Sequence, residues 1–244
     1  MSGGGVDEIP VTQIIHLALQ RESKPALSDS GVWAEALDLV EPGAQRVYWG
    51  RSLEHPQHGQ LHIVRRNLAQ HHQFLKSDSY QQFLAIHERI TGQPQKPVVR
   101  HAQIKSWTPN DPSLARGAPF VGTAIYLNTI DGWDDGAWPL WTHIVRHVGG
   151  CLGCAGGPVL EPVETCPGPL QKLLEGEKAT QTFNRSYIVY VGWESPEKHD
   201  AFHHTEHFAK HFVILNCVND GYAEYGHIVF EGSREKGIDI AAKM

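Results

Sequence analysis

Residues 186–193 alternate between two sets of side chains, and one set consists of Tyr187, Val189, Val191 and Trp193. Aromatic and β-branched residues with a period of two predict a half-buried β-strand. Ser195 and Pro196 then supply an N-cap and a first helical residue, so a helix should follow directly. Apolar residues at helical spacing predict one helix over 196–212, with a buried face made of Ala201, Phe202, Thr205, Phe208, Ala209 and Phe212.

A weaker copy of this strand–helix unit lies at residues 60–83. The strand of the copy ends at Arg66, and His72 falls in the place of His199. A short strand is predicted after each helix, at 98–107 and at 223–231. Each half therefore has the order strand, helix, strand, strand, helix, strand. This order predicts an internal duplication, in which both halves share one fold.

The other elements follow from the same periodicities. In the strand predicted at 11–20, Ile15, Leu17 and Leu19 share the richer apolar face, which should pack against helices and leave His16 on the opposite face. Further strands are predicted at 46–53, 60–66 and 120–128 and in the glycine-rich stretch after residue 148. Further helices are predicted from Ser28 or Asp29 to Val40, at 70–90, at 138–148 and at 169–175.

The segment GWESPEKHDAFHHTEHF closes its strand on Trp193, Glu194 and Ser195 and places His199 four residues after the serine. In these residues the chain resembles the antibiotic biosynthesis monooxygenase (ABM)-like proteins of the dimeric α+β barrel superfamily. In the first half Arg66, Asn67 and Leu68 stand in place of the Trp-Glu-Ser motif, and His72 remains. Members of this superfamily have ferredoxin-like halves whose sheets face each other across a ligand-holding cavity.

The resemblance therefore implies an α+β fold class, with tandem ferredoxin-like repeats forming an intramolecular α+β barrel. We expect a first ferredoxin-like half at 11–107, a proline-containing linker at 108–118 and a second half at 119–232. A flexible N-terminus (1–10) and a C-terminal tail (233–244) should flank them. The superfamily includes cofactor-free oxygenases, isomerases, cyclases, decarboxylases and haem enzymes, so the fold does not select one reaction.

Composition narrows the class of protein. The 244 residues are 41% hydrophobic and 20% charged, as is usual for globular proteins. The net charge of −6 gives no reason to expect binding to nucleic acid or to an acidic membrane. No apolar run approaches the roughly 20 residues of a membrane span. The segment MSGGGVDEIP lacks the basic start and apolar centre of a signal peptide, so we expect a cytoplasmic protein.

Cys151 and Cys154 form a CxxC motif within the glycine-rich stretch, which is predicted to be a strand. Residues three apart in a regular strand face opposite sides, so this pair should not close easily. Buried structural cysteines are the favoured interpretation. The alternatives are a metal site, for which Cys166 could supply one of the two further ligands that zinc needs, and a redox pair, although redox CxxC motifs usually lie at a helix N-terminus.

Four of the sixteen histidines, His199, His203, His207 and His211, are spaced four residues apart on the helix predicted at 196–212. Such spacing suits a transition metal. The stripe lies opposite the phenylalanine face, however, so we interpret it as a solvated helix face, from which only His199 at the strand–helix junction is excepted. The sequence contains no Gly-x-Ser-x-Gly elbow, dinucleotide-binding fingerprint or HExxH motif.

Strand alternation then selects side chains for a ligand cavity. The candidate catalytic bases are His16, His62 and His227, because a neutral imidazole can remove an acidic phenolic or C–H proton near neutral pH. The candidate substrate-binding residues are Tyr126, Tyr190, Trp193, His72 and His199, and no metal ligand is assigned. For each buried histidine, the competing interpretation is a hydrogen-bonded core residue.

From the resemblance we expect a cofactor-independent enzyme that deprotonates a small aromatic or polyketide-like ligand of secondary metabolism. The anion would react with oxygen, cyclise, isomerise or lose carbon dioxide. The alternatives are a haem- or metal-dependent α+β barrel enzyme and a non-catalytic small-molecule-binding or structural barrel protein. No cofactor, nucleic acid or membrane partner is expected, and formation of a homodimer is left open.

Overall fold

The computed structural model describes residues 9–19, 27–92, 94, 96–165 and 180–235. The short helix predicted at 169–175, Cys166, residues 1–8 of the N-terminus and the tail after Glu235 lie outside these described residues. The chain divides into two compact units. The first takes in the residues up to His101 and those from Glu231 onward, and the second spans Ala102–Phe230.

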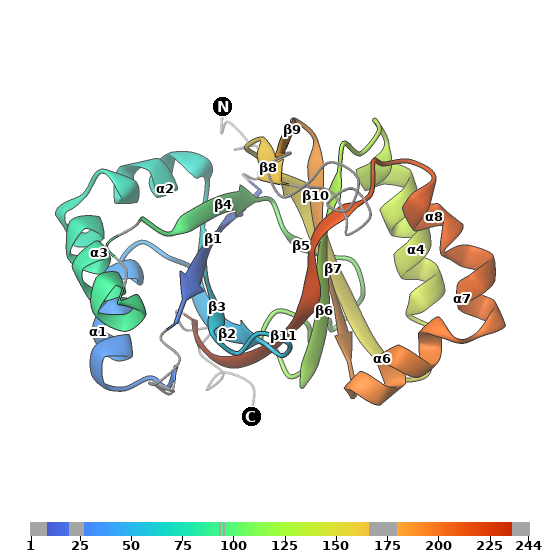
Figure 1. Cartoon of the computed structure of the whole chain (residues 1–244), viewed down its shortest axis with the longest axis horizontal. Coiled ribbons are helices and arrows are strands. Elements are labelled where there is room, and N and C mark those ends of the chain that lie inside the picture. The colour runs from blue at the N-terminus through green and yellow to red at the C-terminus, as the bar shows by residue number, and fades with distance from the viewer. Residues whose placement is uncertain (1–8, 20–26, 93, 95, 166–179, 236–244) are drawn as a thin grey trace, which may run out of the picture. The chain divides into compact units, whose positions relative to one another are not determined.

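The first unit is a four-stranded antiparallel sheet to which the end of the last strand is added. The elements follow in the order β1 (Val11–Ala18), α1 (Gly31–Val40), β2 (Arg46–Ser52), β3 (His58–Arg65), α2 (Leu68–Leu75), α3 (Asp78–Thr91) and β4 (Val98–Ala102). The strands lie side by side in the order β4-β1-β3-β2-β11. Figure 1 shows α1, α2 and α3 on one face of this sheet.

The second unit repeats this arrangement. Its main elements are β6 (Phe120–Leu127), α4 (Trp138–Val145), β7 (Cys151–Val159), β10 (Ser186–Trp193), α6 (Pro196–His203), α7 (Glu206–His211), α8 (Val213–Asn216) and β11 (Tyr222–Glu235). It also has a π-helical turn (Trp133–Ala137) and the short strands β5 (Lys105–Ser106), β8 (Val163–Thr165) and β9 (Gln181–Phe183). Its sheet has the order β11-β6-β10-β7, which is the ferredoxin-like order of the first unit, β4-β1-β3-β2. The predicted α+β fold class with tandem ferredoxin-like halves is therefore confirmed.

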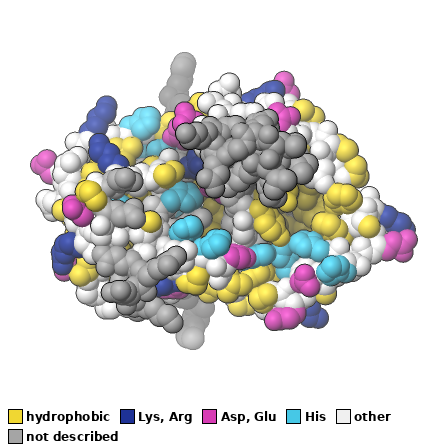
Figure 2. Space-filling view, viewed as in Figure 1, with side chains coloured by type: hydrophobic (Ala, Val, Ile, Leu, Met, Phe, Trp, Pro, Cys, Tyr) yellow, Lys and Arg dark blue, Asp and Glu magenta, His cyan; other side chains and the backbone are white. Residues whose placement is uncertain are grey.

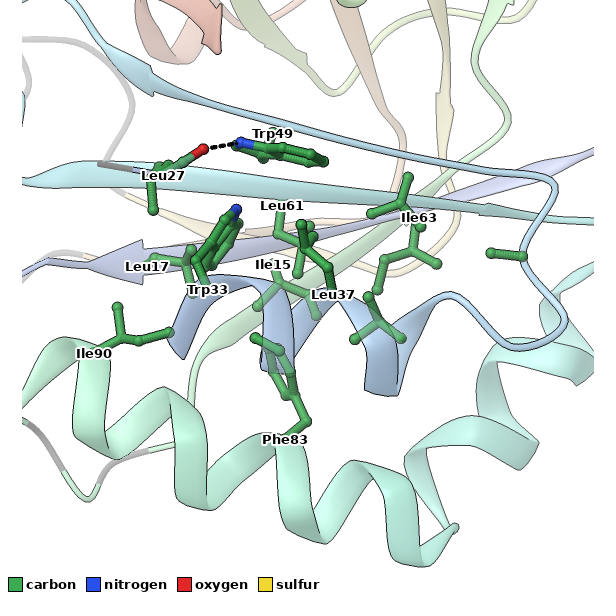
Figure 3. Close-up of a cluster of buried hydrophobic side chains, with 14 of the residues drawn as sticks. Ile15, Leu17, Leu27, Trp33, Leu37, Trp49, Leu61, Ile63, Phe83 and Ile90 are labelled. Carbon is green, nitrogen blue, oxygen red and sulfur yellow. Dashed lines mark hydrogen bonds between the residues drawn. The ribbon is translucent and has the colours of Figure 1, made fainter. Parts of the chain in front are cut away.

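The core of the first unit lies between its sheet and its helices. Ile15 and Leu17 of β1 pack with Trp33 of α1 and Phe83 of α3, as Figure 3 shows. The indole nitrogen of Trp49 donates a hydrogen bond to the Leu27 carbonyl at the edge of this cluster. Since Ile15 and Leu17 face the helices, the predicted orientation of β1 is correct and His16 lies on the opposite face.

Each long helix predicted after the third strand of a half is in fact broken. In the first half α2 ends at Leu75 and α3 begins after Ser77, whose hydroxyl accepts a hydrogen bond from the Tyr80 amide. In the second half Thr205 caps α7 in the same way, through the Phe208 amide. A capping hydroxyl favours the start of a new helix, which apolar periodicity alone does not reveal. The single helices predicted at 70–90 and 196–212 are therefore wrong.

The caps correct the alignment of the two halves. Asn67 caps α2 and Ser195 caps α6, and in both halves the next cap, Ser77 or Thr205, comes ten residues later. Counting from these caps makes His71, not His72, the counterpart of His199. The same count makes Arg65 the counterpart of Trp193 and Phe74 the counterpart of Phe202.

The strand β11 runs to Glu235, three residues into the tail predicted from residue 233. Its last residues belong to the first unit, where Arg234 forms ion pairs with the carboxylates of Asp29, Asp38 and Glu41. None of the helices that the structure describes is both long and apolar enough to span a membrane.

Candidate functional site

The second unit contains an apolar cavity of about 470 Å³ between its sheet and its helices. Gly122 and Tyr126 of β6, and Val191 and Trp193 of β10, form the sheet side. The helical side consists of Trp138 and Trp141 of α4, His199, Phe202 and His203 of α6, and Phe208 of α7. Tyr222, Tyr225 and Phe212 also line the cavity and are exposed, so they form its mouth. Figure 2 shows hydrophobic side chains gathered in a hollow beside histidines on this unit.

Two histidines meet at the sheet side of this cavity. The Nε2 atom of His227 lies 3.0 Å from Nδ1 of His199, which is hydrogen-bonding distance. His227 stacks on Phe120 at 4.5 Å between ring centroids, and His199 lies 4.7 Å from Trp193. Gly122 is opposite His227 in the strand register, and the absence of a side chain there leaves space next to the His199 ring. We call His199 and His227 the histidine dyad.

The electrostatics of the cavity favour neutral imidazoles. Burial, together with smaller contributions from the nearby His203 and His227, lowers the pKa of His199 to about 3. Burial also lowers the pKa of His203. His199 is therefore uncharged at neutral pH and can accept or donate a proton through its Nε2 atom. The pKa of Tyr126 is raised by burial and by Tyr222 and Tyr225, which keeps this phenol protonated.

Buried polar atoms remain available in the wall of the cavity. The indole nitrogens of Trp138 and Trp193 are buried and have no hydrogen-bond partner among the residues that the structure describes. Both side chains line the cavity and are almost completely inaccessible to solvent. An unsatisfied buried N–H group costs free energy, so either indole would gain from a ligand oxygen within reach.

In the first unit the equivalent space is filled. The strand partner of Arg65 is Val11, and Gln13 follows Val11 by two residues. The strand partner of Trp193, the counterpart of Arg65, is Phe120, and Gly122 follows Phe120 by two residues. Gln13 therefore occupies the position that corresponds to Gly122. The Gln13 Nε2 atom lies 3.0 Å from Nε2 of His101. Arg65 lies 3.3 Å from His71 Nδ1 and stacks over Phe74. The first unit thus has a hydrogen-bonded polar cluster where the second has its apolar cavity, and Arg65 and Phe74 line a smaller pocket of about 320 Å³.

The structure brings some of the predicted site residues together and separates others. Tyr126, Trp193 and His199 line the cavity, and His227 lies directly behind His199. Tyr126 faces the helices rather than the opposite sheet face, which corrects the orientation inferred from alternation.

The remaining predicted residues lie elsewhere. Tyr190 lies on the sheet face opposite Val189 and Val191. His62 is buried against Tyr48 at 4.6 Å in the first unit, and its pKa is lowered well below the usual value by burial and by His16. His72 is exposed at the surface and contacts His101. Their roles in catalysis or binding stay predictions.

Sequence reasoning missed Gly122 and His203. His203 was assigned to a solvated stripe, yet it packs at 4.4 Å on His199 and at 4.7 Å on Phe208. The chain turns at Thr205, so the stripe is interrupted, and His207 is exposed. The signals were present: a glycine inside a strand marks a close approach, and a Thr before Glu marks a helix start. In the described part of the chain, no group of three or more His, Cys, Asp or Glu side chains is arranged to hold a metal ion.

Comparison with known proteins places the fold. No family model matches the chain, and no curated protein matches it. Among solved structures, an anthrone oxidase-like protein is similar with a TM-score of 0.64 and 13% identity, covering 98% of each chain. The chain has the fold of that protein.

Two further structures agree. A suggested monooxygenase from Fusobacterium nucleatum has a TM-score of 0.56 at 9% identity and covers 94% of this chain and 95% of its own. A suggested monooxygenase from Lactobacillus acidophilus has a TM-score of 0.53 at 14% identity, with 94% and 98% covered. At such identities the likeness establishes the α+β barrel fold and no particular family.

Proposed function

We propose that this protein is an enzyme that removes a proton from a planar, phenol-bearing aromatic substrate of the polyketide type and lets the resulting carbanion react with molecular oxygen. The observation that carries the proposal is the hydrogen-bonded histidine dyad, with a neutral His199, at the inner wall of an aromatic cavity. The cavity falls within the range of about 300–1,000 Å³ that small-molecule sites occupy. The names of the similar structures support oxygen chemistry.

The dyad can move the proton in two linked steps. His199 Nε2 takes the proton from the substrate while His199 Nδ1–H passes its own proton to His227 Nε2. The positive charge then lies on His227, next to the face of Phe120. The low pKa of His199 would make it a weak base alone, but the anion formed beside it raises the affinity of the dyad for the proton.

The anion carries the electrons that oxygen needs. Transfer of one electron to O₂ and recombination of the two radicals give a carbon-bound hydroperoxide after protonation by the dyad. Loss of water from that hydroperoxide converts a CH₂ group into a carbonyl group, so that CH₂ plus O₂ becomes C=O plus H₂O. The walls formed by Trp141, Phe202 and Phe208 would hold the ring and exclude bulk water during these steps.

The test is turnover of a hydroxylated anthrone. The purified chain should consume one O₂ for each quinone formed, measured with an oxygen electrode and by quinone absorbance. His199→Ala and His227→Asn should each lower kcat by about 10²–10⁴-fold, the usual contribution of a general base. His207→Ala, which changes an exposed histidine on the neighbouring helix α7, is the matched control and should leave kcat unchanged.

The same experiment separates the other interpretations. Binding without O₂ uptake or product would reject the oxygenase and support a binding protein. Conversion without O₂ uptake would indicate cyclisation, isomerisation or decarboxylation. An absorbance spectrum and metal analysis of the untagged protein test the haem- or metal-dependent alternative, and stoichiometric haem or metal would overturn a cofactor-independent reaction. The homodimer and the cytoplasmic location stay predictions.

A further inference from the structure

The CxxC motif lies in an irregular part of β7. In the pairing of β7 with β10, Gly192 is opposite Gly153 and Trp193 is opposite Cys151, so Leu152 is an extra residue on β7. Such a β-bulge shifts the alternation of side chains by one position. Cys151 therefore shares a sheet face with Cys154, which is opposite Val191. The expectation that the two cysteines face opposite sides is wrong because it assumed a regular strand.

The two thiols are in contact. The side chains of Cys151 and Cys154 are hydrogen-bonded to each other, and both thiols are free. Cys154 is fully buried in the core of the second unit, whereas Cys151 is partly accessible. The Cys154 amide donates a hydrogen bond of 2.9 Å to the Thr108 hydroxyl, which helps to fix the motif. The buried Cys154 thiol thus lies beside the partly accessible Cys151 thiol.

The surroundings make the two cysteines unequal. The hydrogen bond from Cys154 lowers the pKa of Cys151, while the same hydrogen bond and, after it, burial raise the pKa of Cys154. The Asp111 carboxylate lies against Gly153 and opposes ionisation of both thiols. The aliphatic stem of Lys198 covers Gly150, immediately before Cys151. Cys151 is thus the more readily ionised and the more accessible thiol of the pair.

We infer that Cys151 and Cys154 form a peroxide-oxidisable dithiol, in which Cys151 is the attacking thiol and Cys154 the resolving one. The Cys151 thiolate attacks hydrogen peroxide, breaks the O–O bond and becomes a sulfenic acid, while hydroxide leaves. The Cys154 sulfur then displaces hydroxide from the sulfenic sulfur, and the S–S bond forms. Two thiols and one H₂O₂ give one disulfide and two water molecules, and the two electrons come from the sulfurs.

The location of the pair connects it to the cavity without depending on the proposed function. Trp193 is the strand partner of Cys151 and packs on His199 at 4.7 Å. The pair lies on the sheet face that carries Trp193, and Cys154 belongs to the same core cluster as this tryptophan. A disulfide here would be formed next to the wall of the cavity rather than at a remote surface.

The experiment uses the full chain with Cys166→Ser and Cys217→Ser, which leaves only the pair. After reduction and treatment with near-stoichiometric H₂O₂, we expect the intact mass to fall by two hydrogen atoms and peptide mapping to find Cys151 joined to Cys154. Dithiothreitol should reverse the change. In the chain with all four cysteines, Cys151 should react at least about tenfold faster than the exposed Cys217.

Further variants in the same background assign the two roles. Cys154→Ser should leave a sulfenic acid at Cys151 that dimedone labels, whereas Cys151→Ser should leave Cys154 unlabelled. Circular dichroism verifies that each variant is folded. The disulfide itself is tested in a chain that keeps both Cys151 and Cys154, so that result does not depend on a substitution at either residue. The inference is overturned if the mass does not fall, if Cys151 proceeds to a sulfinic acid without pairing, or if Cys151 in the four-cysteine chain joins Cys166 or Cys217.

Discussion

The two halves of this protein share a frame and differ in what fills it. Both place a histidine four residues after a helix cap, the buried His71 in the first half and the partly buried His199 in the second. In the first half Gln13 and Arg65 occupy the space around that histidine. In the second half Gly122 and Trp193 stand in their places and a cavity remains. A ligand site can therefore be opened or closed in this frame by a few residues at equivalent positions.

The histidines behave alike in spite of this difference. Burial lowers the pKa of both His71 and His199 to about 3. Each also contacts a histidine of the last strand in its half. The ring centroids of His71 and His101 are 5.1 Å apart, and those of His199 and His227 are 5.0 Å apart. Neutral imidazoles are thus a property of the frame, whereas access to them is a property of the residues that surround them.

The largest expected effect tests the closed half. Arg65 donates hydrogen bonds to the Val40 carbonyl and to His71 in a buried setting. Arg65→Met leaves both acceptors unsatisfied, so it should lower the free energy of unfolding by about 3 kcal/mol. Urea denaturation measures this, and Arg66→Met at the adjacent exposed position should be nearly neutral. An equal loss in both variants would refute a specific role for the buried guanidinium.

The second effect is on pH dependence. The folded pKa of His71, about 3, is below its ordinary value of 6.5, so the unfolded state binds more protons between these values. The free energy of unfolding is therefore highest above about pH 6.5. It falls as the pH decreases toward 3, by at most about 1.4 kcal/mol per pH unit for this histidine. His71→Gln and His199→Gln should each flatten this slope, since the folded pKa of both histidines is about 3. Unfolding curves from pH 7 to 4 measure it, and parallel slopes in all three proteins would contradict the assignment.

A smaller effect should follow from closing the open half. Gly122→Gln introduces into the cavity the residue that fills the first half, so ligand affinity should fall at least about tenfold, or about 1.4 kcal/mol. Gly122→Ala is the control, since a Cβ there would meet His199 and His227 only at ordinary contact distances of 3.5 Å or more. Titration calorimetry with a hydroxylated anthraquinone measures both. Unchanged affinity in the glutamine variant would place the ligand elsewhere.

The smallest effect concerns the two matched caps. Ser77→Ala and Thr205→Ala each remove one hydroxyl acceptor at the start of α3 or α7, which should cost about 1 kcal/mol of stability. Thr205→Ala should also weaken ligand binding, because α7 carries Phe208 of the cavity wall. Ser77→Ala should leave binding unchanged. Thermal unfolding with and without ligand separates the two results.

The fold could be predicted because its signals are local and repeated. Alternation in residues 186–193 and the matching element order of the halves determined the class. The helix breaks could not be read from apolar spacing, since Lys76 and His204 interrupt a periodicity that continues on both sides. An alignment of the two halves that does not use the caps is off by one residue, so it pairs His72 rather than His71 with His199.

The site was predicted only in part for a different reason. Trp193 and His199 could be found from the motif, because that motif lies at the strand–helix junction beside the cavity. The side of the sheet was harder to predict, since strands such as Phe120–Leu127 are buried on both faces and alternation has no polar side to mark. The bulge at Leu152 arises from the pairing of β7 with β10, and no residue of the CxxC motif indicates this pairing in the sequence.

The strand β11 begins in one compact unit and ends in the other, which receives its edge strand from residues 231–235. A fragment ending at His101 would contain the first unit without this edge strand. The strand β2, which lies next to β11 in the full chain, would then become an unpaired edge, open to pairing with strands of other molecules. The first unit therefore depends on the C-terminal segment of the chain for its outer strand, although the rest of that unit lies before residue 102. Recombination that exchanges one half must also bring a compatible last strand with it.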